Sequence, residues 1–202
     1  MTTTVTGLFD HYSDATSAVD QLKAAGISED DISIVSNNAD GRYKDSDVGE
    51  DAGTGAGIGA AVGGVGGLLT GLGIMAIPGV GPVVAAGWLA AMAAGAVTGA
   101  VVGGAAGGLI GALTDSGVDE LDAHVYAEGV RRGGTLVTAK VDEGRAAEAE
   151  AILQRSNWVD LPTRRTAYEG QGWTGFDDAS EPYSQAEIDA ERARYAGRAS
   201  AL

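Results

Sequence analysis

The sequence predicts an α+β protein: a ferredoxin-like split βαβ domain interrupted by a long glycine-zipper α-helical hairpin. Two strand–helix–strand patterns, in residues 1–51 and 115–161, flank a stretch of different composition. That stretch, residues 52–114, has no charged side chain and holds 20 of the 33 glycines. Many of these glycines recur every four residues, a spacing that places them on one face of a helix.

These observations divide the chain into four parts. Residues 1–51 are the first βαβ half with an acidic linker, and residues 52–114 are the glycine-zipper hairpin. Residues 115–161 are a second αβαβ half that completes the domain, and residues 162–202 are a polar tail with a terminal helix. The hairpin is therefore expected to be an insertion between two halves of one sheet.

The first half shows strand and helix signals in turn. Residues 4–9 are rich in Val and Thr, which predicts a strand. A helix capped by Ser13 or Asp14 follows, and Gly26 ends it. Residues 32–36 predict a second strand, and the acidic, breaker-rich residues 37–51 predict a linker.

The second half repeats this order of elements. Residues 119–132 predict a helix, residues 135–141 a strand, residues 143–155 a helix and residues 158–161 a short closing strand. Two such units form a four-stranded antiparallel sheet backed by helices, which is the ferredoxin-like arrangement. In the tail, residues 185–195 predict the terminal helix.

The glycine ladders are the candidate helix-packing residues. They are Gly55, Gly59, Gly63, Gly67 and Gly71 in the first arm, and Gly87, Gly95, Gly99, Gly103, Gly107 and Gly111 in the second. Each glycine costs a helix about 0.5–1 kcal/mol relative to alanine, so close packing must compensate if the arms are helical. A column of glycines permits such an approach. Residues 77–82, rich in Pro and Gly, predict the turn between the arms.

Two hypotheses account for the hairpin, and a third places it inside the fold. In the first hypothesis the hairpin inserts into the membrane from the cytoplasmic side, because arms of about 26 and 31 residues are long enough to cross a bilayer. In the second, the hairpins are buried between subunits of a closed homo-oligomeric bundle or shell in the cytoplasm. In the third, the hairpin is buried within the protein's own fold. The most hydrophobic residues of both arms lie near the turn.

Charge and composition exclude several classes of partner. The formal net charge is −15, which opposes binding to nucleic acid. There is no Cys, so neither disulfides nor thiolate metal sites are expected. Residues 1–31 lack the basic region and apolar core of a secretory signal, so we expect a protein that is not secreted.

Catalytic chemistry is not indicated. His11 and His124 have no carboxylate or Cys at ligand spacing, so each is interpreted as a surface or satisfied histidine, and no metal, cofactor or small-molecule substrate is expected. Residues 71–76 match a dinucleotide fingerprint only superficially, since neither a preceding strand nor the later acidic residue is present. Arg131 and Arg132 are a candidate anion contact or, more simply, helix C-terminal charges.

Several segments resemble a known family. Residues 5–10, 18–22 and 32–35 of this sequence resemble the domain of general stress protein 17M-like, heat-induced YflT-type stress proteins. Residues 125–137 are similar to a matching second half, and residues 172–177 and 187–192 to a recurrent tail. The resemblance implies a bacterial stress-response context and carries over no catalytic residue.

Together these inferences predict a non-enzymatic bacterial stress-response protein that associates through its glycine-zipper hairpin. Its expected partner is a second copy of itself, and under the first hypothesis also the lipid bilayer. A large exposed apolar surface does not stay monomeric in water, so both association hypotheses predict assembly.

Overall fold

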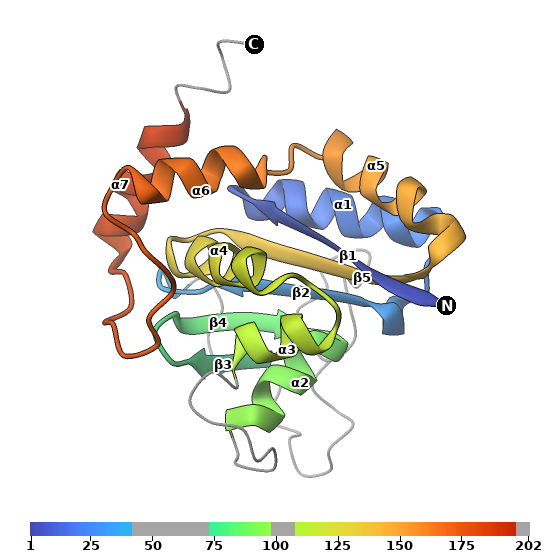
Figure 1. The fold of residues 1–202 in the computed structure, drawn as a ribbon, viewed down its shortest axis with the longest axis horizontal. Coiled ribbons are helices and arrows are strands. Elements are labelled where there is room, and N and C mark those ends of the chain that lie inside the picture. Colours follow the sequence, from blue (N-terminus) through green and yellow to red (C-terminus); the bar gives the residue numbers. More distant parts are fainter. Residues whose placement is uncertain (42–72, 98–107, 197–202) are drawn as a thin grey trace.

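The computed structural model describes residues 1–41, 73–97 and 108–196 (Figure 1). Within these ranges a five-stranded sheet is combined with seven α-helices, so the predicted mixture of helix and sheet is confirmed. The strands are β1 Thr2–Phe9, β2 Ile32–Asn37, β3 Gly73–Ile77, β4 Gly81–Ala86 and β5 Thr135–Asp142. The α-helices are α1 Tyr12–Ala24, α2 Trp88–Val97, α3 Leu109–Asp115, α4 Glu120–Arg131, α5 Ala146–Arg155, α6 Leu161–Glu169 and α7 Gln185–Ala196. Single 3₁₀ turns, η1 Glu29–Asp31 and η3 Glu143–Arg145, precede β2 and α5.

The sheet joins the two predicted halves of the chain. Its strand order is β1-β5-β2-β4-β3, and every neighbouring pair is antiparallel. Leu136 of β5 lies opposite Leu8 of β1 on one side and Val35 of β2 on the other. A strand from the second half therefore lies between the two parallel strands of the first half.

The predicted closing strand at residues 158–161 does not form, and a helix begins there instead. The Val159 amide donates to the carbonyl of Leu8 at 2.7 Å, so this segment still lies beside β1. Helix α6 then starts at Leu161, because the Asp160 side chain accepts a hydrogen bond from the Thr163 amide and Pro162 occupies the first turn. Asp at the N-cap followed by Pro is a helix-start signal, and here it outweighs the strand propensity of the residues before it.

The prediction of two helical arms is wrong for residues 73–77 and 81–86, whereas residues 88–97 and 109–115 of the second arm are helical as predicted. Residues 73–77 and 81–86 are the strands β3 and β4, joined by a turn at the predicted position. In that turn Gly79 and Gly81 adopt φ of 72° and 95°, and the Val80 amide donates to Ile77 O at 3.0 Å. A continuous apolar run that is buried on both faces cannot be assigned to helix or strand by periodicity alone.

The helices cover both faces of the sheet (Figure 1). Helices α1 and α5 bury Val19, Leu22 and Leu153 against one face, together with Val84 and Val137 from the strands. Helices α2, α3 and α4 cover the other face, where their buried residues meet Leu8, Val35, Val83 and Leu136 of the sheet. Strand β4 thus contributes neighbouring residues to both cores, as its unbroken apolar sequence requires.

Helix α2 brings the hydrophobic end of the predicted hairpin into this second core. Leu89 is fully buried, and its amide donates to the Ser33 hydroxyl at 2.8 Å. The indole of Trp88 donates to the carbonyl of Asp31 at 3.0 Å. These contacts favour the third hypothesis, burial within the protein's own fold, for the start of α2.

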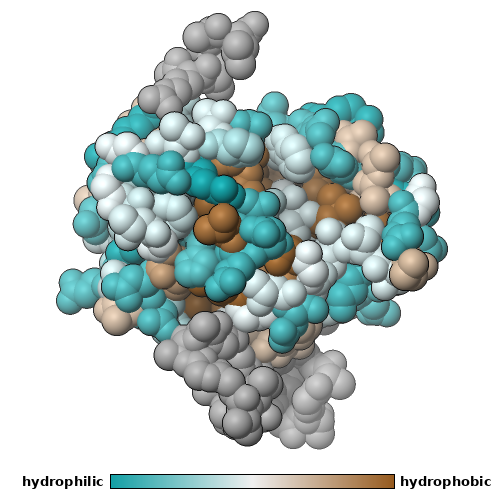
Figure 2. Space-filling view, in the orientation of Figure 1, coloured by the Kyte–Doolittle hydropathy of each residue, from teal (hydrophilic) through white to brown (hydrophobic). Residues whose placement is uncertain are grey.

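No helix in the described ranges is both long enough and apolar enough to span a membrane. The face seen in Figure 2 is mainly hydrophilic over the described residues, with small hydrophobic areas between elements.

Candidate functional site

Three of the predicted helix-packing glycines lie in the described part of the chain. Gly87 lies between β4 and α2, Gly95 lies in α2 and Gly111 lies in α3. The remaining ladder positions fall outside the described residues: Gly55, Gly59, Gly63, Gly67, Gly71, Gly99, Gly103 and Gly107.

Gly87 has a packing role that differs from the predicted one. Its φ is 86°, a left-handed conformation that favours glycine. A Cβ built there would collide with the backbone of β2, at the carbonyl of Ile32 and 2.8 Å from Ser33 Cα. Gly87 thus permits close approach between β2 and the junction of β4 with α2, and it does not lie in a groove between two helices.

The candidate anion contact, Arg131 and Arg132, is occupied by internal partners. Arg132 is 7% exposed; its Nε donates to Glu128 Oε1 at 2.5 Å and its Nη1 to Glu191 Oε1 at 2.8 Å. Arg131 contacts the other oxygen of Glu128 at 3.4 Å and donates to the Glu181 carbonyl at 3.0 Å. The buried carboxylates already neutralise Arg132, so a free anion has to displace Glu191 to reach it.

This ion-pair cluster fastens the tail to the domain. Glu191 and Ile188 of α7 are 4% and 1% exposed. Arg192 of the same helix donates to the Gly133 carbonyl at 2.9 Å, and Ile188 packs against the Cα of Gly133 so closely that a Cβ would collide with it. The terminal helix that the sequence predicts is confirmed, and its docking against α4 explains the paired arginines.

Docking of α7 is expected to weaken in acid. Burial raises the pKa of Glu191, but hydrogen bonds and the charge of Arg132 outweigh it, so that the pKa lies below the usual 4.5. A carboxylate with a lowered pKa in the folded state stabilises that state above its unfolded pKa, and this contribution is lost as pH falls through the lowered value. Hydrogen exchange of α7 amides should therefore accelerate below about pH 4.5, relative to β5 amides.

The variant Glu191→Gln is the control for this acid effect. The α7 amides of this variant should exchange faster than those of the wild-type chain already at pH 7. The ratio of the α7 exchange rate to the β5 exchange rate should also change less with pH in the variant than in the wild-type chain. An identical pH response in both proteins would show that Glu191 does not fasten the tail.

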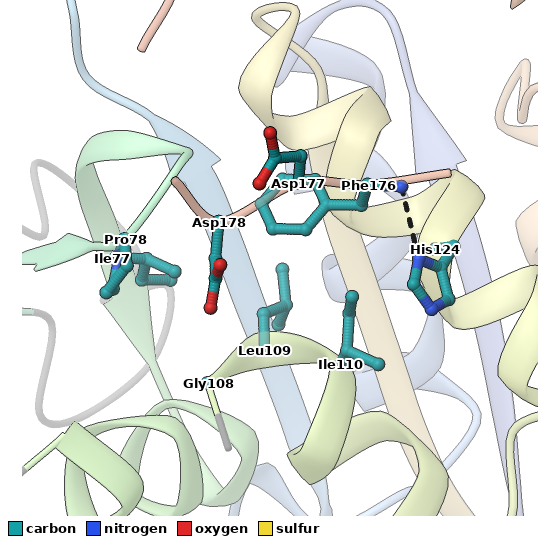
Figure 3. Close-up of a pocket in the computed structure, with 9 residues that line it drawn as sticks. All are labelled: Ile77, Pro78, Gly108, Leu109, Ile110, His124, Phe176, Asp177 and Asp178. Carbon is teal, nitrogen blue, oxygen red and sulfur yellow. Dashed lines mark hydrogen bonds between the residues drawn. The ribbon is translucent and has the colours of Figure 1, made fainter. Parts of the chain in front are cut away.

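A cavity of about 300 Å³ lies between the β3–β4 turn, α3, α4 and the loop before α7 (Figure 3). This cavity is the candidate binding site. Nine residues line it: Ile77, Pro78, Gly108, Leu109, Ile110, His124, Phe176, Asp177 and Asp178. The lining is mainly apolar. Its polar groups are the imidazole of His124 in α4 and the carboxylates of Asp177 and Asp178 in the loop.

The loop that closes the cavity is fixed at both sides. His124 Nδ1 accepts a hydrogen bond from the Phe176 amide at 3.1 Å, as Figure 3 shows. On the other side the turn glycine Gly79 lies so close that its Cβ would be 2.7 Å from Asp178 Cα. The interpretation of His124 as a satisfied histidine is therefore correct, although the residue also borders a cavity.

Sequence reasoning did not find this cavity. Its lining comes from four separate elements, and no spacing along the chain links Ile77 to His124 or Asp178. Aromatic residues of the tail pack on the domain itself: Phe176 contacts the core, and the ring of Trp173 lies edge-on to that of Tyr168 with 5.8 Å between the ring centroids. The described residues contain no cluster of His, Cys, Asp or Glu that could hold a metal ion.

Comparison with known proteins gives one family. Residues 4–76 match the model described as the heat induced stress protein YflT domain. The resemblance found in the sequence is thereby confirmed over this range, which includes most of β1, all of α1 and β2, and most of β3. No curated protein and no solved structure matches the chain.

Proposed function

We propose, for a chain whose residues 4–76 match the heat-induced YflT-type stress protein family, a non-enzymatic stress-response role exercised through self-association. The family match supports the stress-response role. Self-association is the more specific part of the proposal, and the segregation of charge along the chain is compatible with it. All 28 acidic and 13 basic residues lie outside residues 52–114, so two copies with a net charge of −15 each repel one another except through this segment.

The single observation that carries the proposal is the edge strand β3. It pairs only with β4 among the described strands and forms the last position of the sheet. Its five residues, Gly73–Ile77, contain no charge and no proline, the features by which proteins usually protect a sheet edge from pairing. A second copy can extend the sheet there by antiparallel pairing, which places both β3 strands across a two-fold axis.

A ferredoxin-like core and glycine-zipper packing are compatible with this proposal. Strands β1, β5 and β2 have the split arrangement, with the connection through α1 between the parallel pair. Strands β4 and β3 extend this sheet beyond β2. Insertion of a hairpin into a bilayer is the competing hypothesis, and it loses support because Trp88 and Leu89 are engaged in the domain core.

The variant Ala76→Lys tests the edge. Ala76 is exposed in β3, and a lysine there places a charge at the pairing edge. We expect the self-association constant to fall by at least about tenfold, because a charged side chain on an edge strand disfavours pairing with a second strand. Sedimentation velocity across a concentration series is the measurement.

Ala147→Lys is the matched control, since Ala147 is exposed in α5 on a different part of the molecule. It makes the same change in net charge and should leave association unchanged. A wild-type chain that remains monomeric at all concentrations would refute the proposal. Association that requires vesicles would favour the bilayer hypothesis instead.

A further inference from the structure

We propose that the cavity bounded by Leu109, Ile110, Phe176 and Asp178 binds a small amphipathic organic cation. The ammonium group of this ligand pairs with the Asp178 carboxylate, and its apolar part lies against the hydrophobic wall. This inference goes beyond the proposed self-association and does not depend on it.

The size and the walls of the cavity suit a small apolar body. Its volume of about 300 Å³ lies at the lower end of the range of ligand pockets. Leu109 and Ile110 from α3 and Ile77 from β3 present aliphatic side chains, and Phe176 presents its ring from the loop (Figure 3). Transfer of a ligand's apolar surface from water to these walls supplies the driving force for binding.

The two neighbouring carboxylates of the loop differ in what they already bind. Asp177 accepts hydrogen bonds from the Ala179 amide at 3.0 Å and the Ser180 hydroxyl at 2.9 Å. Those bonds, that of the Ala179 amide first, lower the pKa of Asp177 and occupy its oxygens within the loop. The Asp178 carboxylate forms no hydrogen bond or ion pair with any described residue and extends between the hairpin turn and Leu109 (Figure 3).

The sign of the charge determines the class of ligand. No Lys or Arg belongs to the described lining of the cavity, so nothing there compensates the charge of Asp178. His124 accepts the Phe176 amide through Nδ1, so a neutral ring carries its proton on Nε2. The cavity thus combines an apolar wall with an uncompensated carboxylate, an arrangement complementary to an amine attached to a hydrocarbon.

A series of three matched probes tests this inference on the full chain at pH 7.5. Cyclohexylammonium, cyclohexanol and cyclohexanecarboxylate share one ring and differ in charge. We expect titration, followed by NMR at the amides of Leu109 and Phe176, to give the tightest binding for cyclohexylammonium and the weakest for cyclohexanecarboxylate.

Asp178→Asn should weaken cyclohexylammonium binding about three- to fivefold, the effect of a partly exposed ion pair, and leave cyclohexanol binding unchanged. Asp20→Asn, on an exposed position of α1, makes the same change in net charge and should alter neither. Equal affinity for the three probes, shifts confined to amides elsewhere, or unchanged cyclohexylammonium binding in Asp178→Asn would each overturn the inference. Sedimentation of the same samples distinguishes this outcome from a failure of the self-association proposal.

Discussion

Replacement of Gly87 by alanine should lower the free energy of unfolding by about 3 kcal/mol, because two costs add at one residue. The first is backbone strain, since φ is 86°. The second is collision of the new Cβ with backbone atoms of Ile32 and Ser33, which cannot move without displacing β2. Differential scanning calorimetry of the purified variant measures the loss.

Gly26→Ala separates the two costs. Gly26 also has a φ of 86°, but a Cβ there meets nothing within 4 Å. It should therefore cost only the strain, about 1–2 kcal/mol. Equal destabilisation by the two variants would mean that the approach of residue 87 to β2 does not determine the stability of this region.

Arg132→Ala should have a comparable or larger effect, a loss of about 3–5 kcal/mol, because it leaves buried charge without a partner. The side chains of Glu128 and Glu191 are 1% and 5% exposed and both bind this guanidinium. The guanidinium also lies 4.1 Å above the ring of the buried Tyr168, so its removal opens space in the contact between α4 and α6. Urea denaturation monitored by circular dichroism measures the change.

Arg155→Ala is the control for loss of an arginine as such. Arg155 ends α5 and is exposed, so its removal should change stability by less than about 0.5 kcal/mol. If Arg132→Ala cost no more than this control, the ion-pair cluster would not hold the tail on the domain.

Local sequence signals predicted the elements that have one apolar and one polar face, or whose ends carry a capping residue. Helix α1 follows from the spacing of Ala15, Ala18, Val19 and Leu22, all of them buried. Helix α4 begins where the Asp119 side chain accepts from the Leu121 amide. These cues depend on neighbouring residues alone, so the chain order of strands and helices could be predicted without a structure in the first half and from α4 to α5 in the second, whereas the strand predicted at residues 158–161 does not form.

The candidate site could not be predicted in this way. The wall of the cavity joins residues from β3, α3, α4 and the loop before α7, and its outermost residues, Ile77 and Asp178, are 101 positions apart in the chain. No single one of these residues has a spacing that indicates binding, and His124 and Phe176 separately have ordinary explanations. The site exists only because the hairpin turn and the tail loop pack against one another.

By itself the sequence determined the mixture of helix and sheet, the pairing of strands from both halves, the segregation of charge and the match of residues 4–76 to the YflT domain model, because composition and local periodicity encode these properties. The tertiary structure alone decided that residues 73–86 form strands, that Gly87 approaches β2, and that Arg132 fastens α7. The same physical reason applies to all three features. An uncharged run, a glycine or an arginine permits several conformations and partners, and contacts with residues distant in the sequence select one of them.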